Sequence, residues 1–171
     1  VITSDQEVIK ASDKLVFPGV GAIKDCMEAF SNDLKETVLE EVKKKPTLAI
    51  CVGMQMLLES SEENGGVEGL GLLNGKVCKI QSNKDIKVPH MGWNQVEFSQ
   101  SHFLWEGLES SKDFYFVHSY ASKEINEKYI YSKTFHGESF NSAVAKDNIF
   151  ATQFHPEKSG KSGLNLLQNF I

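Results

Sequence analysis

Apolar and polar positions in the first sixty residues follow two alternating patterns. Short apolar runs are typical of buried strands, and apolar residues three and four positions apart are typical of helices that pack on a sheet. The predicted strands are 1–4, 14–17 and 47–50, and the predicted helices are 5–11, 22–30 and 34–45. Strands that alternate with helices in this way indicate a parallel α/β sheet.

After residue 65 the pattern changes to short apolar runs separated by glycine-containing turns. Such turns favour strands that run antiparallel to their neighbours. The predicted strands are 77–80, 95–98, 114–117, 129–135, 140–145 and 149–154, and a closing amphipathic helix covers 163–170. We therefore predict an α/β fold with a mixed, mainly parallel sheet that is flanked by helices and extended by antiparallel strands.

The composition is typical of a globular protein with a single domain at 1–171. Hydrophobic residues make up 40% and charged residues 24% of the chain, and the net charge is -5 without any basic tract. This charge argues against nucleic acid or an anionic membrane as a partner. The three cysteines lack CxxC spacing, which argues against a disulfide framework and a zinc site. The same cysteines are typical of a reducing compartment, and no targeting or transmembrane segment is recognised, so we expect a cytoplasmic location, no metal and no cofactor.

A cysteine lies at the centre of the most informative segment, residues 46–60. Cys51 follows a predicted strand and precedes an apolar, helix-forming run. A nucleophile on such a sharp turn stands exposed above the sheet, where the helix dipole favours a thiolate and the Val52 N–H faces a developing oxyanion. Ala49 and Gly53 are the small neighbours that the turn needs. The alternative interpretation is a buried structural cysteine.

A second turn, Pro18-Gly19-Val20-Gly21, follows the predicted strand 14–17. Two glycines around one residue leave the backbone free to present N–H groups to a neighbour. The carboxyl ends of parallel strands meet at one edge of a sheet, so we expect this turn to lie beside Cys51. It is either an ordinary strand-to-helix connection or a second oxyanion donor.

His155 is the best candidate for a catalytic base. Pro156 favours an extended conformation at His155, in which residues two apart share a face, so Glu157 can lie beside the ring. A carboxylate on one imidazole nitrogen leaves the other free to deprotonate Cys51. The alternative is a surface histidine next to a solvated carboxylate. His118 also closes an aromatic strand but lacks a paired carboxylate, and the other histidines are interpreted as surface or packing residues: His90, His102 and His136.

Several motifs match a known family: FPGVGA, AICVGMQ followed by SEE, VPHMGWN, FVHSYA, and ATQFHPEKS with its closing GLNLLQNF. Through them nearly the whole chain resembles class I glutamine amidotransferases. Within this class it is most similar to the glutaminase subunits of imidazole glycerol phosphate synthase. The cysteine turn and HPE are shared across the class, whereas VPHMGWN and HPEKS point to the narrower group.

The resemblance implies that glutamine is hydrolysed to glutamate and ammonia through a Cys51 thioester, with His155 and Glu157 completing the catalytic set. It implies an oxyanion hole at Val52, Gly19 and Val20, and substrate binding by Gln55, Glu63, Ser119 and Tyr120. Gln55 lies one helical turn beyond Cys51 and so faces the same way. Glu63 offers a charge for an ammonium group, although its polar SSEEN surroundings are also typical of a solvated helix end.

The resemblance further implies that ammonia passes to a cyclase subunit with a (β/α)8 barrel, because nothing in this chain resembles a phosphate loop. We expect binding of this partner to reorient residues 18–21 and complete the oxyanion hole. The positions that match the contact are Trp93, Asn94, Tyr115 and Lys158, although Trp93 is also compatible with a core aromatic. The alternatives are a paralogous glutaminase that feeds another synthase, for example in sugar amidation, and an inactive docking subunit.

Two departures from the family pattern concern the fold. Ala49 stands where the class usually has glycine, and its small methyl group leaves the turn feasible. The family begins with a strand and a helix, a unit of about 30 residues, and no counterpart precedes Val1. We therefore expect a gap or an unpaired edge in the sheet.

Overall fold

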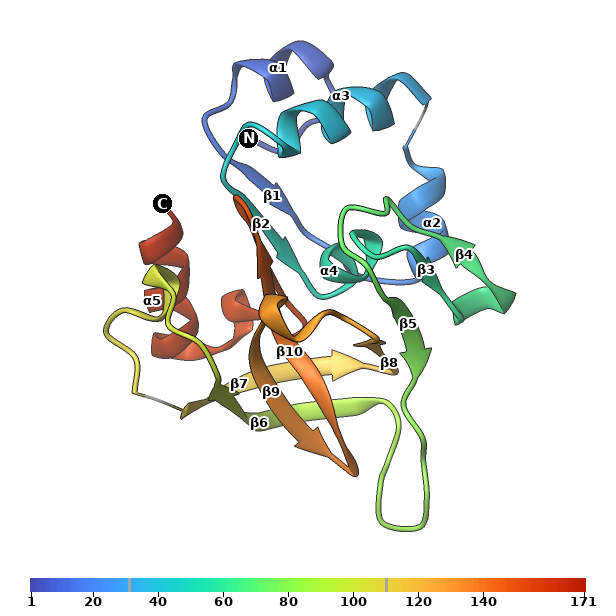
Figure 1. Ribbon diagram of the computed structural model, residues 1–171, viewed down its shortest axis with the longest axis vertical. Coiled ribbons are helices and arrows are strands. Elements are labelled where there is room, and N and C mark those ends of the chain that lie inside the picture. Colours follow the sequence, from blue (N-terminus) through green and yellow to red (C-terminus); the bar gives the residue numbers. More distant parts are fainter. Residues whose placement is uncertain (31, 110) are drawn as a thin grey trace.

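Two sheets form the framework of the protein (Figure 1). The computed structural model describes residues 1–30, 32–109 and 111–171. Within these residues a seven-stranded sheet has the order β1 (Leu15–Phe17), β2 (Thr47–Ile50), β11 (Ile149–Thr152), β10 (Glu138–Lys146), β9 (Ile130–His136), β6 (His90–Phe98) and β7 (Ser111–His118). A four-stranded sheet has the order β4 (Val67–Glu68), β3 (Ser60–Ser61), β5 (Lys76–Lys79) and β8 (Tyr120–Lys123).

Helices are present in every segment where the sequence pattern predicts one. They are α1 (Gln6–Ala11), α2 (Ile23–Glu28), α3 (Asn32–Val42), α4 (Val52–Met56) and α5 (Gly160–Phe170), with short 3₁₀ turns η1 (Glu63–Gly65), η2 (Phe103–Trp105), η3 (Glu127–Tyr129) and η4 (Pro156–Lys158). Asp5 caps α1 by accepting a hydrogen bond from the Glu7 N–H at 2.9 Å.

The strand predictions were less complete. Residues 1–4 form no strand and are exposed. β6 begins at His90 instead of Gln95, so most of the VPHMGWN motif is strand. The strands β3, β4 and β8 were missed. Two of them have only two residues, which is too short for an apolar pattern to reveal.

The seven-stranded sheet is mixed, as predicted, but the expectation that it is mainly parallel was wrong. Among the described strands, β2 runs parallel to β1 and β11, whereas the pairs from β11 through β10, β9 and β6 to β7 are antiparallel. The reason lies in the connections. The turns that join β9, β10 and β11 are too short for the crossover that a parallel pair needs.

Alternate residues of the central strands divide the core between two apolar clusters. On β2, Leu48 and Ile50 belong to one cluster and Ala49 to the other. The first cluster contains Leu166 of α5, and the second contains Val38 of α3. Figure 1 shows α1 and α3 together beyond β1, well away from α5. Because successive side chains of a strand point to opposite faces, the short strand β2 is held by packing on both.

β1 lies at one edge of the seven-stranded sheet, with β2 as its only partner among the described residues. Val16 in this strand is 52% exposed. These observations agree with the expected unpaired edge.

A close contact between α5 and the turn that follows His155 gives a test of the fold. A Cβ at Gly163 would lie 1.8 Å from the Pro156 carbonyl oxygen, so the helix must withdraw if a side chain is added. We expect Gly163→Ala to lower the free energy of unfolding by about 1–3 kcal/mol, as overpacking does. Chemical denaturation measures this change. Lys161→Ala, at an exposed position of the same helix, is the control, and equal stability of the two variants would contradict the contact.

Candidate active site

The turn from β2 into α4 has the sharp geometry that the sequence predicts. Cys51 has φ 55° and ψ −109°, a strained conformation that costs about 1–3 kcal/mol in a residue other than glycine. Its N–H donates to the Thr152 carbonyl oxygen at 2.7 Å. A Cβ at Gly53 would lie 2.2 Å from the Phe17 carbonyl oxygen, so position 53 requires glycine. The predicted turn and its need for a small residue after the cysteine are therefore confirmed.

The prediction that this turn exposes the thiol and favours the thiolate was wrong for the structure described here. Cys51 is only 4% exposed. Burial raises the pKa of its thiol to about 12, although the Val52 N–H and the Gln153 amide act in the opposite direction. The sulfur lies 4.0 Å from the Val117 carbonyl oxygen and 3.6 Å from Gln153 Nε2. The thiol is thus enclosed by the neighbouring strand ends and stays protonated at neutral pH.

His155 and Glu157 form the expected pair. The imidazole Nδ1 lies 2.7 Å from Glu157 Oε1, and the ring is 2% exposed. Because a carboxylate only accepts, Nδ1 carries the hydrogen of the neutral ring and Nε2 carries a free lone pair. Within residues 1–30, 32–109 and 111–171, Nε2 has no hydrogen-bond partner, Cys51 included. The base is therefore oriented and unoccupied.

Strand β7 fixes the backbone at His155. The His155 N–H donates to the Tyr115 carbonyl oxygen at 2.9 Å. Ser159, which is buried, donates through Oγ to the His155 carbonyl oxygen at 2.6 Å and accepts from the Tyr115 N–H at 2.9 Å. Sequence reasoning missed Ser159, and its place in the HPEKS motif was the only available signal. These three bonds hold the imidazole at the end of the sheet.

A cavity of about 320 Å³ joins the nucleophile and the base. The predicted site residues that line it are Gly19, Val20, Cys51, Val52, Gln55, Glu63, Ser119, Tyr120 and His155. Glu157 stands behind the ring of His155, with 44% of its side chain exposed. The chain therefore gathers residues from both its halves around one space next to the thiol.

Residues 2–171 match the family Glutamine amidotransferase class-I. The chain belongs to this family. It is 49% identical over 172 residues to the imidazole glycerol phosphate synthase subunit HisH of Acinetobacter baylyi. This match covers 99% of this chain and 84% of the relative. It is 47% identical over 173 residues to the subunit of the same name from Methanocaldococcus jannaschii, covering 100% of this chain and 86% of the relative.

The solved structures of glutamine amidotransferases support the fold assignment. One has a TM-score of 0.72 at 18% sequence identity and covers 98% of this chain and 84% of its own. Another, from Thermotoga maritima, has a TM-score of 0.61 at 16% identity and covers 94% of this chain and 63% of its own. At these identities the likeness concerns the fold alone.

In this amidotransferase, Gln55 is tied to protein groups at the base of the cavity. Its Nε2 donates to the Tyr120 carbonyl oxygen at 3.0 Å and to Gln153 Oε1 at 3.2 Å. Sequence reasoning missed Gln153, although it precedes His155 by two residues, the spacing at which residues of an extended chain share a face. Its amide links Gln55 to the thiol, because Gln153 Nε2 donates to Cys51 Sγ.

Glu63 is another lining residue of the cavity. Its Oε2 accepts a hydrogen bond from the Ile23 N–H, at the start of α2, at 3.0 Å. The alternative that Glu63 is a freely solvated helix end is therefore wrong. The turn at residues 18–21 precedes α2 and packs on α4, since a Cβ at Gly19 would lie 2.2 Å from the Gly53 nitrogen. Val20 is 75% exposed, and its carbonyl oxygen accepts from Cys26 Sγ at 3.8 Å.

The residues predicted for the partner contact share one region next to His155. Trp93 is 58% exposed, which rules out its interpretation as a core aromatic. It lies opposite Tyr115 in the β6–β7 pair, with the two rings 6.2 Å apart and 79° from parallel. Lys158 in η4 is exposed. Asn94 differs, because its half-buried amide is hydrogen-bonded within the protein.

The described residues include no group of three or more histidines, cysteines or acidic residues placed to hold a metal ion. Among the same residues, every helix is too short or too polar to span a membrane.

The buried thiol predicts an unusual pH profile of alkylation. Because the pKa of Cys51 is raised to about 12, the thiolate fraction grows throughout the alkaline range. We expect the rate of carboxamidomethylation at Cys51, followed by peptide mass spectrometry in the isolated chain, to rise about tenfold per pH unit from 7 to 10. An unperturbed thiol levels off near its pKa of about 8.5. A plateau below pH 9 would contradict the burial of the thiol.

Proposed function

We propose that this amidotransferase hydrolyses glutamine with Cys51 as nucleophile, His155 as general acid and base, and Glu157 as the group that orients the imidazole. One observation carries the proposal: a cavity lined by both Cys51 and His155, in which the free Nε2 lone pair belongs to a ring held by a carboxylate at Nδ1. Membership of the glutamine amidotransferase family supplies the substrate.

The chemistry proceeds in two halves. Cys51 Sγ attacks the side-chain carbonyl carbon of glutamine, its proton moves to His155 Nε2, and His155 then donates that proton to the departing ammonia. Water next attacks the thioester and loses a proton to Nε2, which returns it to the sulfur as glutamate leaves. The N–H groups of Val52 and of the Gly19–Val20 peptide stabilise the oxyanion in both halves.

The lining of the cavity also offers groups that can bind the α-ammonium and α-carboxylate groups of the substrate. The Glu63 carboxylate, which lines the cavity, accepts a charge-assisted hydrogen bond from the α-ammonium group. Gln55 and the backbone of Ser119 and Tyr120 bind and orient the remainder. These residues come from η1, α4 and the bend between β7 and β8, so the pocket has three independent supports.

The resting site needs a rearrangement before it can react quickly. The thiol is buried with a raised pKa, and Cys51 makes no hydrogen bond to His155 Nε2 within the described parts of the chain. The turn at residues 18–21 is the element next to the sulfur that a partner can reach, because Val20 is largely exposed. We infer that binding of the synthase partner reorients this turn and completes the oxyanion hole.

The relatives are named as subunits of imidazole glycerol phosphate synthase, so we infer that the ammonia is used by a second protein. That partner is the cyclase subunit, a (β/α)8 barrel, which makes imidazole glycerol phosphate and aminoimidazole carboxamide ribotide in histidine biosynthesis. It docks at the surface that contains Trp93, Tyr115 and Lys158, with Asn94 at its border. Aromatic side chains at the centre of such a surface are typical binding anchors. We place this heterodimer in the cytoplasm, without nucleic acid or membrane as a partner.

Removal of the sulfur tests the nucleophile. We expect Cys51→Ala, assayed in complex with the cyclase, to lower glutamine-dependent synthesis on the order of 10⁴-fold or more. Synthesis from added ammonium salts should remain unchanged, because the partner's reaction needs ammonia alone. Cys78→Ala, which removes a buried thiol of the second sheet, is the matched control. Glutamine-dependent synthesis by Cys51→Ala at the control's rate would disprove the role of Cys51.

The expected activation by the partner is tested separately. Glutamine hydrolysis by the purified chain should rise at least about tenfold on saturation with the cyclase and its ligand, in line with typical coupling free energies. The measurement is glutamate release per active site. Trp93→Ala should need more cyclase to reach the same plateau. An unchanged rate at saturation would refute the rearrangement, and activation by a different synthase alone would favour the paralogue.

A further inference from the structure

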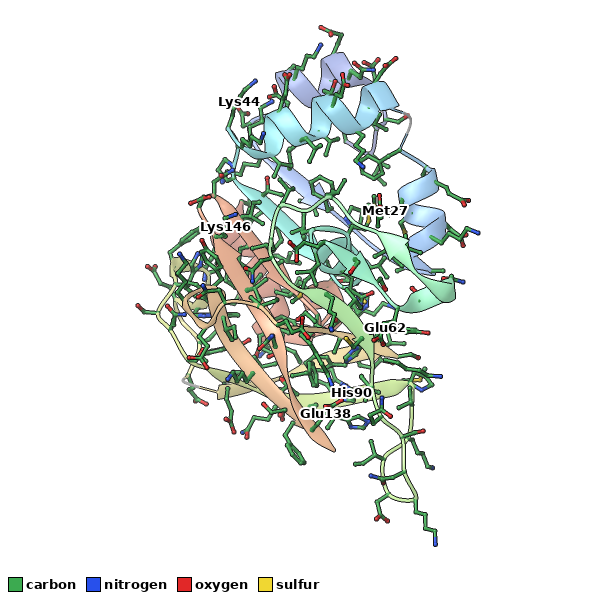
Figure 2. All side chains as sticks on the ribbon, turned by 45° about the vertical axis from the view of Figure 1, so that its right-hand side comes forward. Met27, Lys44, Glu62, His90, Glu138 and Lys146 are labelled. Atoms are coloured by element: carbon green, nitrogen blue, oxygen red, sulfur yellow. The ribbon has the colours of Figure 1, made fainter. Side chains whose placement is uncertain are left out.

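An unbroken line of hydrogen bonds crosses strands β6 and β7 and reaches the cavity at His118, which is one of its lining residues. Asn94 Nδ2 lies 2.9 Å from the Phe135 carbonyl oxygen and 3.0 Å from His90 Nε2. His90 Nδ1 lies 2.9 Å from His118 Nε2, and His118 Nδ1 lies 2.8 Å from the Tyr120 carbonyl oxygen. His90 lies beside the β9–β10 hairpin (Figure 2), where its ring contacts His136 of β9 and Phe140 of β10.

Backbone groups fix the direction of every bond in this line. The Tyr120 carbonyl oxygen can only accept, so His118 Nδ1 carries the hydrogen and Nε2 of the neutral ring accepts. His90 Nδ1 must then donate, which leaves His90 Nε2 as the acceptor for the Asn94 amide. At the other end, the Asn94 amide orientation is set independently. Its Nδ2 faces the Phe135 carbonyl oxygen, and its Oδ1 accepts from the Gln95 N–H at 2.8 Å.

An added proton has no place in this arrangement. A hydrogen on His118 Nε2 would point at the hydrogen on His90 Nδ1. If His90 moved its hydrogen to Nε2, that hydrogen would point at the Asn94 amide. Each choice places two donors face to face, so the complete line exists only when both rings are neutral and both carry the hydrogen on Nδ1.

The surroundings of the two rings also disfavour a positive charge. His90 and His118 are 4% and 6% exposed, and the ring of His90 stacks on Phe116 and meets Phe140 edge-on. The titratable groups that face them are His136 of β9, whose ring stacks on His90 at 4.0 Å, and His155. Burial first, and then His118 and His136, lower the pKa of His90 to about 3. Burial first also lowers the pKa of His118 to about 4, aided by His136 and His155 and opposed by the hydrogen bond to the Tyr120 carbonyl oxygen.

The line ends on a group that the active site uses. The Tyr120 carbonyl oxygen accepts from both His118 Nδ1 and Gln55 Nε2. Gln55 Nε2 also donates to Gln153 Oε1, and Gln153 Nε2 donates to the sulfur of Cys51. The position of this one carbonyl is therefore set from one side by the histidines and from the other by the residues that contact the nucleophile.

We propose that His118, His90 and Asn94 are positioning residues, which hold the substrate-facing bend between β7 and β8 through a one-way line of hydrogen bonds between two neutral imidazoles. His90 and Asn94 lie outside the lining of the cavity, whereas His118 is part of that lining. Their effect reaches the substrate through the Tyr120 carbonyl and the Ser119–Tyr120 backbone. The kinetic consequence rests on the proposed glutaminase function, whereas the protonation states do not.

The protonation states can be measured in the unaltered chain. In ¹⁵N-histidine-labelled protein, long-range ¹H–¹⁵N spectra distinguish the two neutral tautomers from the imidazolium ion. We expect His90 and His118 to be neutral, with the hydrogen on Nδ1, from pH 8 down to pH 5.5. A hydrogen on Nε2 of either ring, or an imidazolium ion at pH 6.5, would overturn the proposal without reference to activity.

Asn94→Asp reverses the bond to His90 and removes the bond to the Phe135 carbonyl oxygen, with almost no change in side-chain shape. A carboxylate oxygen in place of Nδ2 faces the lone pair of His90 Nε2 and demands a hydrogen there. We expect His90 Nε2 to become protonated at pH 7 and the side-chain amide signals of Gln55 to shift. In the complex with saturating cyclase, we expect KM for glutamine to rise about tenfold with kcat changed less than threefold, because ground-state and transition-state binding are lost together.

Asn126→Asp is the matched control, since it makes the same charge change at an exposed cap where an oxygen already accepts from the Lys128 N–H. We expect it to alter neither the histidine spectra nor KM. Asn94→Asp with unchanged histidine tautomers, an unshifted Gln55 amide or an unchanged KM would overturn the positioning role. If the unaltered complex hydrolyses no glutamine, the proposed function fails, and the tautomers and the Gln55 amide still decide the positioning role.

Discussion

The parallel register of β1, β2 and β11 is the constraint on which the site depends. Phe17, Ala49 and Ala151 are aligned across the three strands. Each strand therefore leaves the sheet at the same level, one into the turn at residues 18–21, one into Cys51 and one toward His155. Hydrogen bonds on both sides of β2 give the strained conformation of Cys51 a rigid support, as strain at functional sites requires.

Cys51 and His155 are each held firmly by neighbouring residues, but they make no hydrogen bond to each other among the described residues. The backbone of His155 is bonded to Tyr115, and Ser159 completes that junction. The sulfur of Cys51 instead faces Val117 and Gln153. A buried imidazole nitrogen without a partner costs about 1–3 kcal/mol, so the resting structure retains a polar group that a ligand or a rearrangement can satisfy. The fold thus holds the backbone of both residues rigidly, whereas the contact between Cys51 and His155 Nε2 has still to form when a ligand binds or the site rearranges.

Local signals in the sequence predicted the parts of the site that depend on local geometry. The turn at Cys51 requires glycine at position 53, and the pair of His155 and Glu157 is two residues apart, so both follow from the chain itself. Burial of the thiol was left open as the alternative interpretation, and local signals could not decide it, because segments distant in sequence enclose the sulfur. The same holds for His90, which was interpreted as a surface or packing residue and is a buried hydrogen-bonding group. The mainly parallel sheet was expected from the first sixty residues, and the later hairpins changed the balance.

Glu63 joins two tasks in one carboxylate. It lines the cavity, and it also accepts from the Ile23 N–H, at the end of the segment that contains the turn at residues 18–21. A cation that binds the Glu63 carboxylate competes with the Ile23 N–H for this acceptor and thereby weakens the hydrogen bond at the start of α2. Thermodynamic linkage makes such an effect reciprocal, so any factor by which the position of the turn alters affinity at Glu63 is returned when the cation binds. In this protein, binding in the cavity and the position of the turn at residues 18–21 are therefore energetically coupled.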